Sequence, residues 1–390
     1  MKTSAKLLVF DSHPIQYRAP VFRALHRLSS QMTVYFFNSN FDGSKWWFHE
    51  VGKAKSLAWG IDLTEGYPNE TLNTEQMSFW KTYQKLKSIL LEEKPIAILV
   101  YGYYLKEHWM LHFLCKKLKI ALIFVGETYT SHSSPLRKIF TQPLQNFFFK
   151  GVQKFISIGS KTESFYRSKN ISSSQIISAK YCVDTHFFRR EEPFASQRRA
   201  ELRKNLNIES TDFVLLFVGR LFERKRPQDI IALHELLLPH KNIHTVVIGS
   251  GPLQASLQSS CQELPRFHWL GFQNQNDTRD WYFASDLLVV PSEFETWGLV
   301  VNEAFSCGLP ALVSNTCGVA DDLVQHGENG FIYPVGTIQA AHDHVKLLLE
   351  NREFLQKLGH NAQQKVLGNY RPDQFAQSIY CALTQIVDVV

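Results

Sequence analysis

Residues 293–304 read EFETWGLVVNEA, and they follow a short apolar run at 287–290, LLVV, that is typical of a buried strand. The residues after Gly298 are apolar and periodic, so the pattern predicts that a helix begins there. Glu295 then lies in the loop before the helix, and Glu303 lies about one turn inside it. The two carboxylates can therefore face a single ligand.

The start of this predicted helix is suited to an anion. The first backbone N–H groups of a helix have no partners within the helix and attract negative groups, above all phosphate. A ligand with a diphosphate at the helix tip and hydroxyls near both glutamates would satisfy every polar group of residues 293–304. A nucleotide sugar has this shape.

Strand and helix patterns alternate along the whole chain, which is typical of parallel sheets covered by helices. A chain of 390 residues is long enough for two domains that each bury a core. We therefore expect an α/β protein with two doubly wound, Rossmann-like domains. The predicted strands are 7–11, 33–37, 96–101, 120–125, 153–158, 213–218, 243–248, 286–290 and 310–313, and the predicted helices include 227–238 and 252–264.

A charged segment near 183–193, which ends in a proline, is the natural linker between the domains. The expected domains are residues 1–185 and 190–370. The final stretch, 371–390, has the pattern of one closing helix with Pro372 near its start. We expect this helix to pack back toward the first domain.

The composition is that of an ordinary globular protein, with 44% hydrophobic and 20% charged residues. The first apolar run stops at Asp11, well short of the hydrophobic region of a signal peptide, and no other run is long enough for a membrane span. We therefore expect a cytoplasmic protein. The six cysteines are scattered without a C-x-x-C pair, which favours buried thiols over disulfides or zinc ligands.

The net charge of +6 conceals an asymmetry between the two halves. Residues 1–185 carry 24 Lys and Arg against 13 Asp and Glu, whereas residues 186–390 carry 18 against 23. A basic domain draws acidic partners such as a phosphorylated substrate, an anionic lipid surface or nucleic acid. No zinc finger or other recognised nucleic-acid motif accompanies the charge, so we expect no nucleic-acid partner.

Residues 136–155 mix aromatic and aliphatic side chains with Arg137, Lys138, Lys150 and Lys154. Such a segment can lie on a membrane interface, with its apolar face in the lipid and its cations at the head groups. A core-facing helix is the favoured interpretation, because amphipathic helices usually cover sheets. The charge of the amino-terminal half keeps contact with an anionic membrane open as an alternative.

Basic side chains follow the predicted strand at 213–218. Arg220 and Lys225 come at its carboxyl end, where a planar guanidinium and a compact ammonium can together neutralise a diphosphate and stabilise a leaving group. A solvated basic turn is an equally good interpretation, since Arg224 and Arg226 are also there.

A glycine turn, Gly249-Ser250-Gly251-Pro252, follows the strand at 243–248 and leads into a helix. Glycines in such turns usually serve backbone geometry. This turn nevertheless lies between the basic loop and the glutamate block, as expected if successive strand ends line one pocket. Gly219, Gly249 and Gly251 are therefore candidates for donor binding.

Phe272 follows another predicted strand, where its backbone could contact a nucleotide base. General burial preferences instead favour a core position for both Phe272 and Trp281. No D-x-D pair occurs in the chain, so the usual way of holding magnesium against a nucleotide diphosphate is not visible. The helix tip, Arg220 and Lys225 would replace the metal, and we expect no metal or other cofactor.

Two loops of the first half carry candidate acceptor groups. His13, Gln16 and Tyr17 follow the first strand, at a place where a histidine is about as often structural as functional. Glu127 and His132 follow the strand at 120–125, and one of them could position or deprotonate an acceptor hydroxyl.

The order and spacing of several motifs in the second half resemble glycosyltransferase family 4. The opening of the chain is also similar to the start of a bacterial subgroup that is associated with surface-polysaccharide synthesis. The motifs are FVGRLFERK (217–225), GSGP (249–252), the pair Glu295 and Glu303, GLPALVS (308–314), GENGF (327–331) and, at the opening, SHPIQYRAPVFRAL (12–25).

This resemblance implies a GT-B architecture, in which two Rossmann-like domains face each other across a cleft and the second holds the donor. It implies that Arg220 and Lys225 bind the donor diphosphate, that Glu295 contacts the transferred sugar and that Glu303 holds the ribose. Transfer would retain the anomeric configuration without an obvious covalent nucleophile. Backbone groups of four further residues would meet the sugar and phosphates: Thr296, Trp297, Gly298 and Leu299.

Two loops depart from the family pattern. Ser12-His13-Pro14 stands where the family often has a glycine-rich loop, and residues 317–321 read CGVAD where the family often has G-G-x-x-E. Ligand contacts in these two loops do not follow from the resemblance.

The resemblance predicts a glycosyltransferase that moves a hexose-type sugar from a nucleotide sugar to a glycan or lipid-linked acceptor. The product would be a bacterial lipopolysaccharide, capsule or exopolysaccharide, made at the inner face of the cell membrane. A sugar-nucleotide epimerase with the same architecture is one alternative. A noncatalytic nucleotide- or glycan-binding relative is another, although a degenerate site has no reason to keep all four charges.

Overall fold

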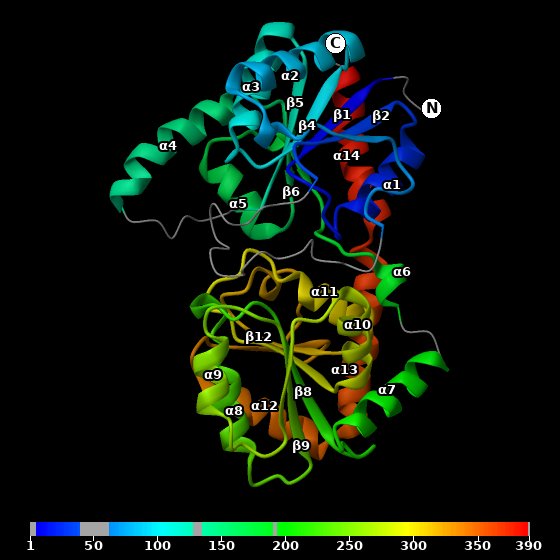
Figure 1. The fold of residues 1–390 in the computed structure, drawn as a ribbon, viewed down its shortest axis with the longest axis vertical. Coiled ribbons are helices and arrows are strands. Elements are labelled where there is room, and N and C mark those ends of the chain that lie inside the picture. Colours follow the sequence, from blue (N-terminus) through cyan, green and yellow to red (C-terminus); the bar gives the residue numbers. More distant parts are fainter. Residues whose placement is uncertain (1–4, 40–61, 128–134, 190–192, 389–390) are drawn as a thin grey trace. The chain divides into compact units, whose positions relative to one another are not determined.

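The structure is a computed structural model that describes residues 5–39, 62–127, 135–189 and 193–388, with the backbone alone over 135–140. Its contacts divide the chain into two compact units. Of the described residues, unit 1 contains 5–39, 62–127, 135–181 and 372–388, and unit 2 contains 182–189 and 193–371. Each unit is a parallel sheet with helices packed against it (Figure 1).

Unit 1 has a seven-stranded sheet in the order β3-β2-β1-β4-β5-β6-β7, and every neighbouring pair is parallel. The central strand β1 is buried throughout, with Val9 opposite Val34 on one side and Leu99 on the other. The strands are β1 (Leu7–Asp11), β2 (Met32–Phe36), β3 (Asn69–Thr71), β4 (Ala97–Tyr101), β5 (Ala121–Gly126), β6 (Lys154–Ser157) and β7 (Ile176–Ser178).

The helices of unit 1 bury apolar faces against this sheet and against one another. The final helix of the chain belongs to unit 1 and packs on its first helix. The helices are α1 (Ala19–Leu28), α2 (Phe79–Glu93), α3 (Lys106–Leu118), α4 (Pro135–Lys150), α5 (Ser160–Ser168) and α14 (Pro372–Val387), with short 3-10 turns η2 (Thr74–Gln76) and η3 (Ser173–Gln175).

Unit 2 has a six-stranded sheet in the order β10-β9-β8-β11-β12-β13, again parallel throughout. Its strands are β8 (Phe213–Val218), β9 (Ile243–Ile248), β10 (Phe267–Gly271), β11 (Leu287–Val290), β12 (Ala311–Ser314) and β13 (Gly330–Tyr333). Its helices are α6 (Thr185–Phe188), α7 (Phe194–Asn205), α8 (Gln228–Leu237), α9 (Gln254–Ser260), α10 (Gln275–Ala284), α11 (Leu299–Ser306), α12 (Ile338–Glu350) and α13 (Arg352–Asn369), with 3-10 turns η4 (Glu223–Lys225) and η5 (Gly318–Ala320).

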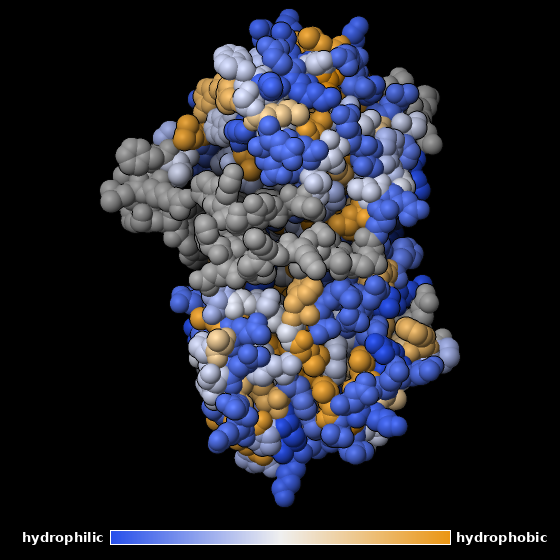
Figure 2. Space-filling view, in the orientation of Figure 1, coloured by the Kyte–Doolittle hydropathy of each residue, from blue (hydrophilic) through white to orange (hydrophobic). Residues whose placement is uncertain are grey.

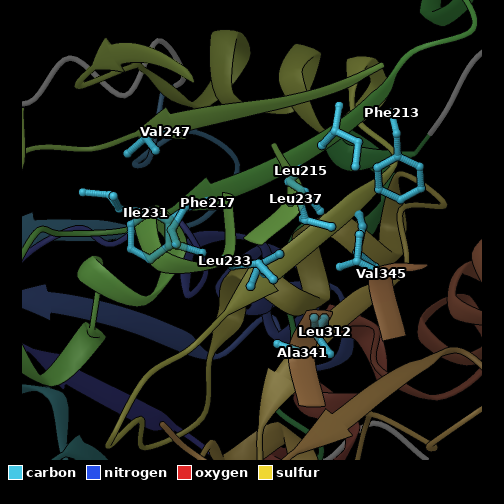
Figure 3. Packing of buried hydrophobic residues seen from close by; sticks show 14 of the residues in the cluster. Phe213, Leu215, Phe217, Ile231, Leu233, Leu237, Val247, Leu312, Ala341 and Val345 are labelled. Atoms are coloured by element: carbon cyan, nitrogen blue, oxygen red, sulfur yellow. The ribbon is translucent and has the colours of Figure 1, made fainter. Parts of the chain in front are cut away.

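The core of unit 2 joins the sheet to residues of four helices, α8, α9, α12 and α13. Phe213, Leu215 and Phe217 alternate along β8 and point from one face of the sheet toward α8 and α12 (Figure 3). Val214 and Leu216 point to the opposite face and are also buried. A strand that is covered on both faces needs a continuous apolar sequence, which is why β8 reads FVLLFV.

A buried ionic cluster holds α7 to this sheet. Asp286, just before β11, accepts hydrogen bonds from the Val214 N–H (2.8 Å), from Arg203 Nη2 (2.7 Å) and from Arg199 Nη2 (2.8 Å). The Arg203 side chain is only 3% exposed. The carboxylate therefore compensates charges that burial would otherwise leave unpaired.

In both sheets the strand order reverses beside the first strand, between β1 and β4 in unit 1 and between β8 and β11 in unit 2. In open sheets of this kind, ligands bind outside the carboxyl ends of the strands at this switch point. The loops after these four strands are therefore the places to look for a site.

All six cysteines lie in the described residues, and none of them forms a disulfide; five are buried. The expectation of buried thiols is confirmed for those five. None of the helices within the described ranges combines the length and the hydropathy needed to cross a lipid bilayer.

Candidate functional site

The loops after β8 and β11 meet at the switch point of unit 2. The backbone N–H groups of Glu293 and Phe294 donate to the carbonyl oxygen of Arg224, at 2.8 and 3.4 Å. Beside this contact, the ammonium group of Lys225 forms an ion pair with the carboxylate of Glu295. The structure thus brings together two of the predicted site residues, which are 70 positions apart in the chain.

Burial makes this cluster of charges favourable for an anion. The Lys225 and Glu295 side chains are only 19% and 16% exposed. Burial, together with the nearby cations of Arg224 and Arg220, lowers the pKa of Lys225 to about 8. Burial and the charge of Arg224 likewise lower the pKa of Arg220 to about 10. A phosphate group beside these cations would stabilise their charged forms.

Two glycines allow the loops after β8 and β9 to touch through their backbones. Gly249 has φ +141°, and a Cβ atom on it would lie 1.8 Å from the carbonyl oxygen of Gly219. A Cβ atom on Gly251 would lie 2.7 Å from the carbonyl oxygen of Leu221. These glycines serve backbone geometry, and the contact they permit holds the loop that carries Arg220.

A third loop fastens the segment that contains Glu295. The N–H of Gly318 donates to the Glu295 carbonyl oxygen, and the N–H of Val319 donates to that of Trp297, both at 3.0 Å. A Cβ atom on Gly318 would lie 2.2 Å from the carbonyl oxygen of Thr296. The CGVAD sequence therefore positions the glutamate loop through its backbone, a role that the sequence patterns did not predict.

Helix α11 begins at Leu299, as the apolar period predicts. Gly298 precedes it with φ +109°, in the left-handed region that favours glycine. The buried indole of Trp297 donates from Nε1 to Asn302 Oδ1 at 2.8 Å. The loop is thereby tied to the first turn of the helix whose N–H groups would meet an anion.

Glu303 has a partner of its own within α10. Its Oε2 accepts a hydrogen bond of 2.6 Å from the Tyr282 hydroxyl. Burial raises the pKa of Glu303 to about 7, although the hydroxyl of Tyr282 opposes this rise. Sequence spacing placed Glu303 one turn inside the helix but carried no signal for Tyr282, which lies 21 positions away on another helix.

The two aromatic residues near β10 differ in exposure. Trp281 is buried, at 5% exposed, so the burial expectation is right for this side chain. For Phe272 it is wrong, because this ring is 49% exposed and directly follows Gly271, whose φ is +66°. A strand that ends in a left-handed glycine leaves the next side chain outside the sheet, where a ring can stack on a planar group.

In unit 1, Arg18 joins the loops after β1 and β5. Its guanidinium donates to Asp11 Oδ1 at 2.5 Å and to Glu127 Oε1 at 2.8 Å, and it lies 4.1 Å from the ring centroid of Tyr101. The Tyr181 hydroxyl also donates to Glu127 Oε1, at 2.5 Å. Of these residues, the sequence patterns singled out Glu127 alone.

The predicted acceptor residues after β1 lie around this cluster. Nδ1 of His13 is 2.9 Å from the Ser12 hydroxyl, and burial lowers the pKa of His13 to about 4, so the ring is neutral at neutral pH. Tyr17 packs edge-on against Tyr181, with ring centroids 5.5 Å apart. The amide oxygen of Gln16 is buried and has no hydrogen-bond partner among the described residues.

His132, the other candidate for handling an acceptor hydroxyl, lies outside the described residues. Within the described ranges, no group of three or more His, Cys, Asp or Glu side chains is arranged to hold a metal ion.

Comparison with known sequences matches the site segment to a family model. Residues 198–365 match the family model described as Glycosyl transferases group 1. An uncharacterized glycosyltransferase of Methanocaldococcus jannaschii is 29% identical over 46% of this chain and 47% of its own length. The N-acetyl-alpha-D-glucosaminyl L-malate synthase of Bacillus anthracis is 25% identical over 47% and 48%, and the capsular polysaccharide biosynthesis glycosyltransferase CapM of Staphylococcus aureus is 26% identical over 40% and 41%. The matches span about half the length of the first two relatives.

Solved structures extend the likeness to the whole chain. Anabaena HepE in complex with UDP superposes with a TM-score of 0.76 at 17% identity, over 97% of this chain and all of that one, and HepE is also solved with UDP-glucose. Sucrose-phosphate synthase of Thermosynechococcus elongatus superposes with a TM-score of 0.72 at 15% identity, over 99% of this chain and all of that one. The chain therefore has the GT-B fold, and its residues 198–365 match the group 1 glycosyl transferases.

Proposed function

We propose that this protein is a retaining glycosyltransferase that moves a hexose-type sugar from a nucleotide-diphosphate donor to a glycan or lipid-linked acceptor. The observation that carries the proposal is the largely buried ion pair of Lys225 and Glu295 at the switch point of unit 2, beside Arg220. This cluster lies inside the segment that matches the group 1 glycosyl transferases.

Lys225 and Arg220 bind the donor diphosphate in this proposal. Their lowered pKa values mean that burial disfavours their charges, and a diphosphate removes this disadvantage when it binds. When the bond to the sugar breaks, negative charge builds up on the leaving phosphate oxygen, where preorganised cations stabilise it. The two side chains thus perform the task that a metal performs elsewhere, and the proposed reaction is independent of metal.

The two glutamates orient the rest of the donor. When Lys225 turns to the diphosphate, the carboxylate of Glu295 is released to accept hydrogen bonds from the hydroxyls of the transferred sugar. Glu303 holds the ribose, because a pair of hydroxyl donors stabilises the ionised carboxylate that burial disfavours. Backbone groups from Thr296 to Leu299 meet the sugar and phosphates at the start of α11.

The acceptor is assigned to unit 1. In this proposal His13, Gln16 and Tyr17 contact the acceptor, and Glu127, held by Arg18 and Tyr181, positions the attacking hydroxyl. His132 is the alternative for this last role. The basic charge of residues 1–185 supports a place at the inner face of the cell membrane, near a lipid-linked acceptor.

The named relatives support the substrate classes. HepE binds UDP and UDP-glucose, which supports a uridine-diphosphate sugar as the first donor to try. CapM acts in capsular polysaccharide synthesis, which supports a cell-surface glycan as the product.

The donor assignment is tested by thermal unfolding of the full chain with a panel of nucleotide sugars, because a ligand that binds the folded form raises its apparent stability. Arg220→Ala and Lys225→Ala should abolish the stabilisation and slow transfer. Arg226→Ala is the matched control, since it removes a cation of the same turn whose guanidinium is bound to Asp229 at 2.8 and 3.0 Å.

A chain that no nucleotide sugar stabilises, or Arg220 and Lys225 variants that bind like wild type, would refute the proposal. Analysis of the products without an acceptor separates the rival functions. An epimerase converts the donor alone, whereas a noncatalytic relative binds the donor and leaves it unchanged with every acceptor.

A further inference from the structure

One outer surface of unit 1 combines exposed apolar side chains with cations. It is formed by α3 and the second half of α4, which lie side by side on the outside of the unit (Figure 1). We call it the α3–α4 face and define it by Phe113, Lys116, Lys117, Leu144, Phe147 and Lys150.

The apolar part of the α3–α4 face is continuous. Phe113, Leu144 and Phe147 are 50%, 58% and 45% exposed. The rings of Phe113 and Phe147 lie 6.0 Å apart between centroids, and Phe147 stacks on Trp109 at 6.5 Å. Figure 2 shows hydrophobic atoms at the surface in this part of unit 1. Single exposed apolar residues are normal, but a joined group of large ones marks an interaction site.

Other residues of α4 fill the core of unit 1, so the exposed Leu144 and Phe147 are not needed there. Phe148 and Phe149 are 0% and 7% exposed and fill the core of unit 1. The favoured interpretation of this segment, a helix that covers the sheet, is therefore right for one face of α4. Leu144 and Phe147, three positions apart, lie beside this buried face and stay about half exposed, although Phe147 contacts Trp109 and Phe113 of α3. The helix therefore has a second apolar stripe that the described elements cover only in part.

The charges that α3 and the described part of α4 expose have a single sign. Lys116, Lys117 and Lys150 are exposed, and Lys106 extends the same face of α3. The one acidic residue of α3, Glu107, is only 4% exposed, and the described side chains of α4 include no acidic residue. An apolar stripe whose own two helices expose cations and, in their described side chains, no carboxylate complements a surface with negative head groups above a hydrocarbon layer.

We propose that the α3–α4 face binds the surface of an anionic lipid bilayer. Phe113, Leu144 and Phe147 enter the boundary between head groups and acyl chains, while Lys116, Lys117 and Lys150 contact the phosphates. The binding does not depend on the transferase reaction, so its failure and that of the donor site can be told apart.

The test is sedimentation of the full chain with vesicles of phosphatidylcholine, with and without about 30% phosphatidylglycerol. The protein should sediment with the anionic vesicles only, and raising the salt to about 0.5 M should release it, because salt screens exposed charges. Equal binding to both kinds of vesicle, or to neither, would overturn the proposal.

Two double variants locate the surface. Lys116→Glu with Lys117→Glu should lower the partition coefficient by at least about tenfold, and Phe113→Ser with Phe147→Ser should also lower it. Matched controls in unit 2 change residues of similar exposure, Lys346→Glu with Lys357→Glu and Leu236→Ser with Leu347→Ser. Both controls should sediment as wild type does, and an equal loss in them would reject the α3–α4 face.

Far-UV circular dichroism and cooperative thermal unfolding of the full chain are the checks that each variant is folded, and both should match wild type. The thermal shift produced by a nucleotide sugar reports unit 2 and should also be unchanged. The oligomeric state in the absence of lipid tests the alternative that the stripe binds a second copy of the chain. If wild type is a dimer that Phe113→Ser with Phe147→Ser separates, while vesicle binding is unaffected, the face belongs to a second copy of the chain and the lipid proposal is wrong.

Discussion

Replacing Glu303 with glutamine should stabilise the protein at alkaline pH and change its stability much less at acid pH. The Glu303 side chain is 8% exposed, and burial raises its pKa from the ordinary 4.5 to about 7. The folded protein therefore opposes ionisation of this carboxyl. A glutamine has no proton to lose, and its amide oxygen can still accept from Tyr282.

The sign and size of the effect follow from the two pKa values. Between pH 4.5 and about 7 the folded protein keeps a proton that the unfolded chain has released, so the free energy of unfolding falls as the pH rises through this window. The whole loss amounts to about 3 kcal/mol and is complete above about pH 7. The Glu303→Gln variant should not show this decline.

The assay is thermal unfolding of both proteins at pH 5 and pH 8. The difference in Tm between variant and wild type should increase by on the order of 5–10 °C between these pH values. Glu350→Gln, on the exposed side of α12, is the control for loss of one negative charge, and its difference should stay constant. If the Glu303→Gln difference is also constant, the fold does not oppose ionisation of Glu303 and the reasoning fails.

Three further predictions concern the rest of unit 2. Because the pKa of Lys225 is about 8, donor affinity measured by titration should fall by about tenfold per pH unit above pH 8, and constant affinity from pH 7 to 9 would contradict this. Gly249→Ala should cost about 3 kcal/mol or more in urea unfolding because of the 1.8 Å approach to Gly219, whereas Gly327→Ala, with φ +76° and open space around it, should cost only about 1 kcal/mol. Asp286→Asn should cost about 3 kcal/mol or more because it leaves Arg199 and Arg203 without a charged partner; the exposed Asp343→Asn is its control, and equal unfolding midpoints would disprove the role of the buried cluster.

The central strands of both sheets could be predicted from the sequence because they are buried on both faces. The apolar runs at 213–218 and 243–248 coincide with β8 and β9. The missed strands are short or lie toward the edges of the sheets. The edge strand β3 reads NET and β7 has no buried residue, so neither has a continuous apolar run. The helix predicted at 252–264 is observed only from Gln254 to Ser260.

The candidate site was only partly predictable. Charged and glycine residues after strands point to loops at the carboxyl edge of a sheet, and Arg220, Lys225 and Glu295 were found in this way. The partners of these groups were not. Lys225 and Glu295 are 70 positions apart, and Arg18 and Glu127 are 109 apart, so no periodicity within one element relates them. The roles of the site residues remain predictions for the experiments above.

By itself the sequence determined that the chain forms two parallel α/β units with charged and glycine-rich loops at the strand ends. The alternation of strand and helix patterns and the apolar runs of buried strands are local properties, so they can be recognised within a short window of residues. The tertiary structure alone decided that β8 lies beside β11, which pairs Lys225 with Glu295, and that α10 brings Tyr282 to Glu303. Strand order and helix packing depend on how distant apolar faces are buried together, and this is why the electrostatics of the site emerged only from the folded chain.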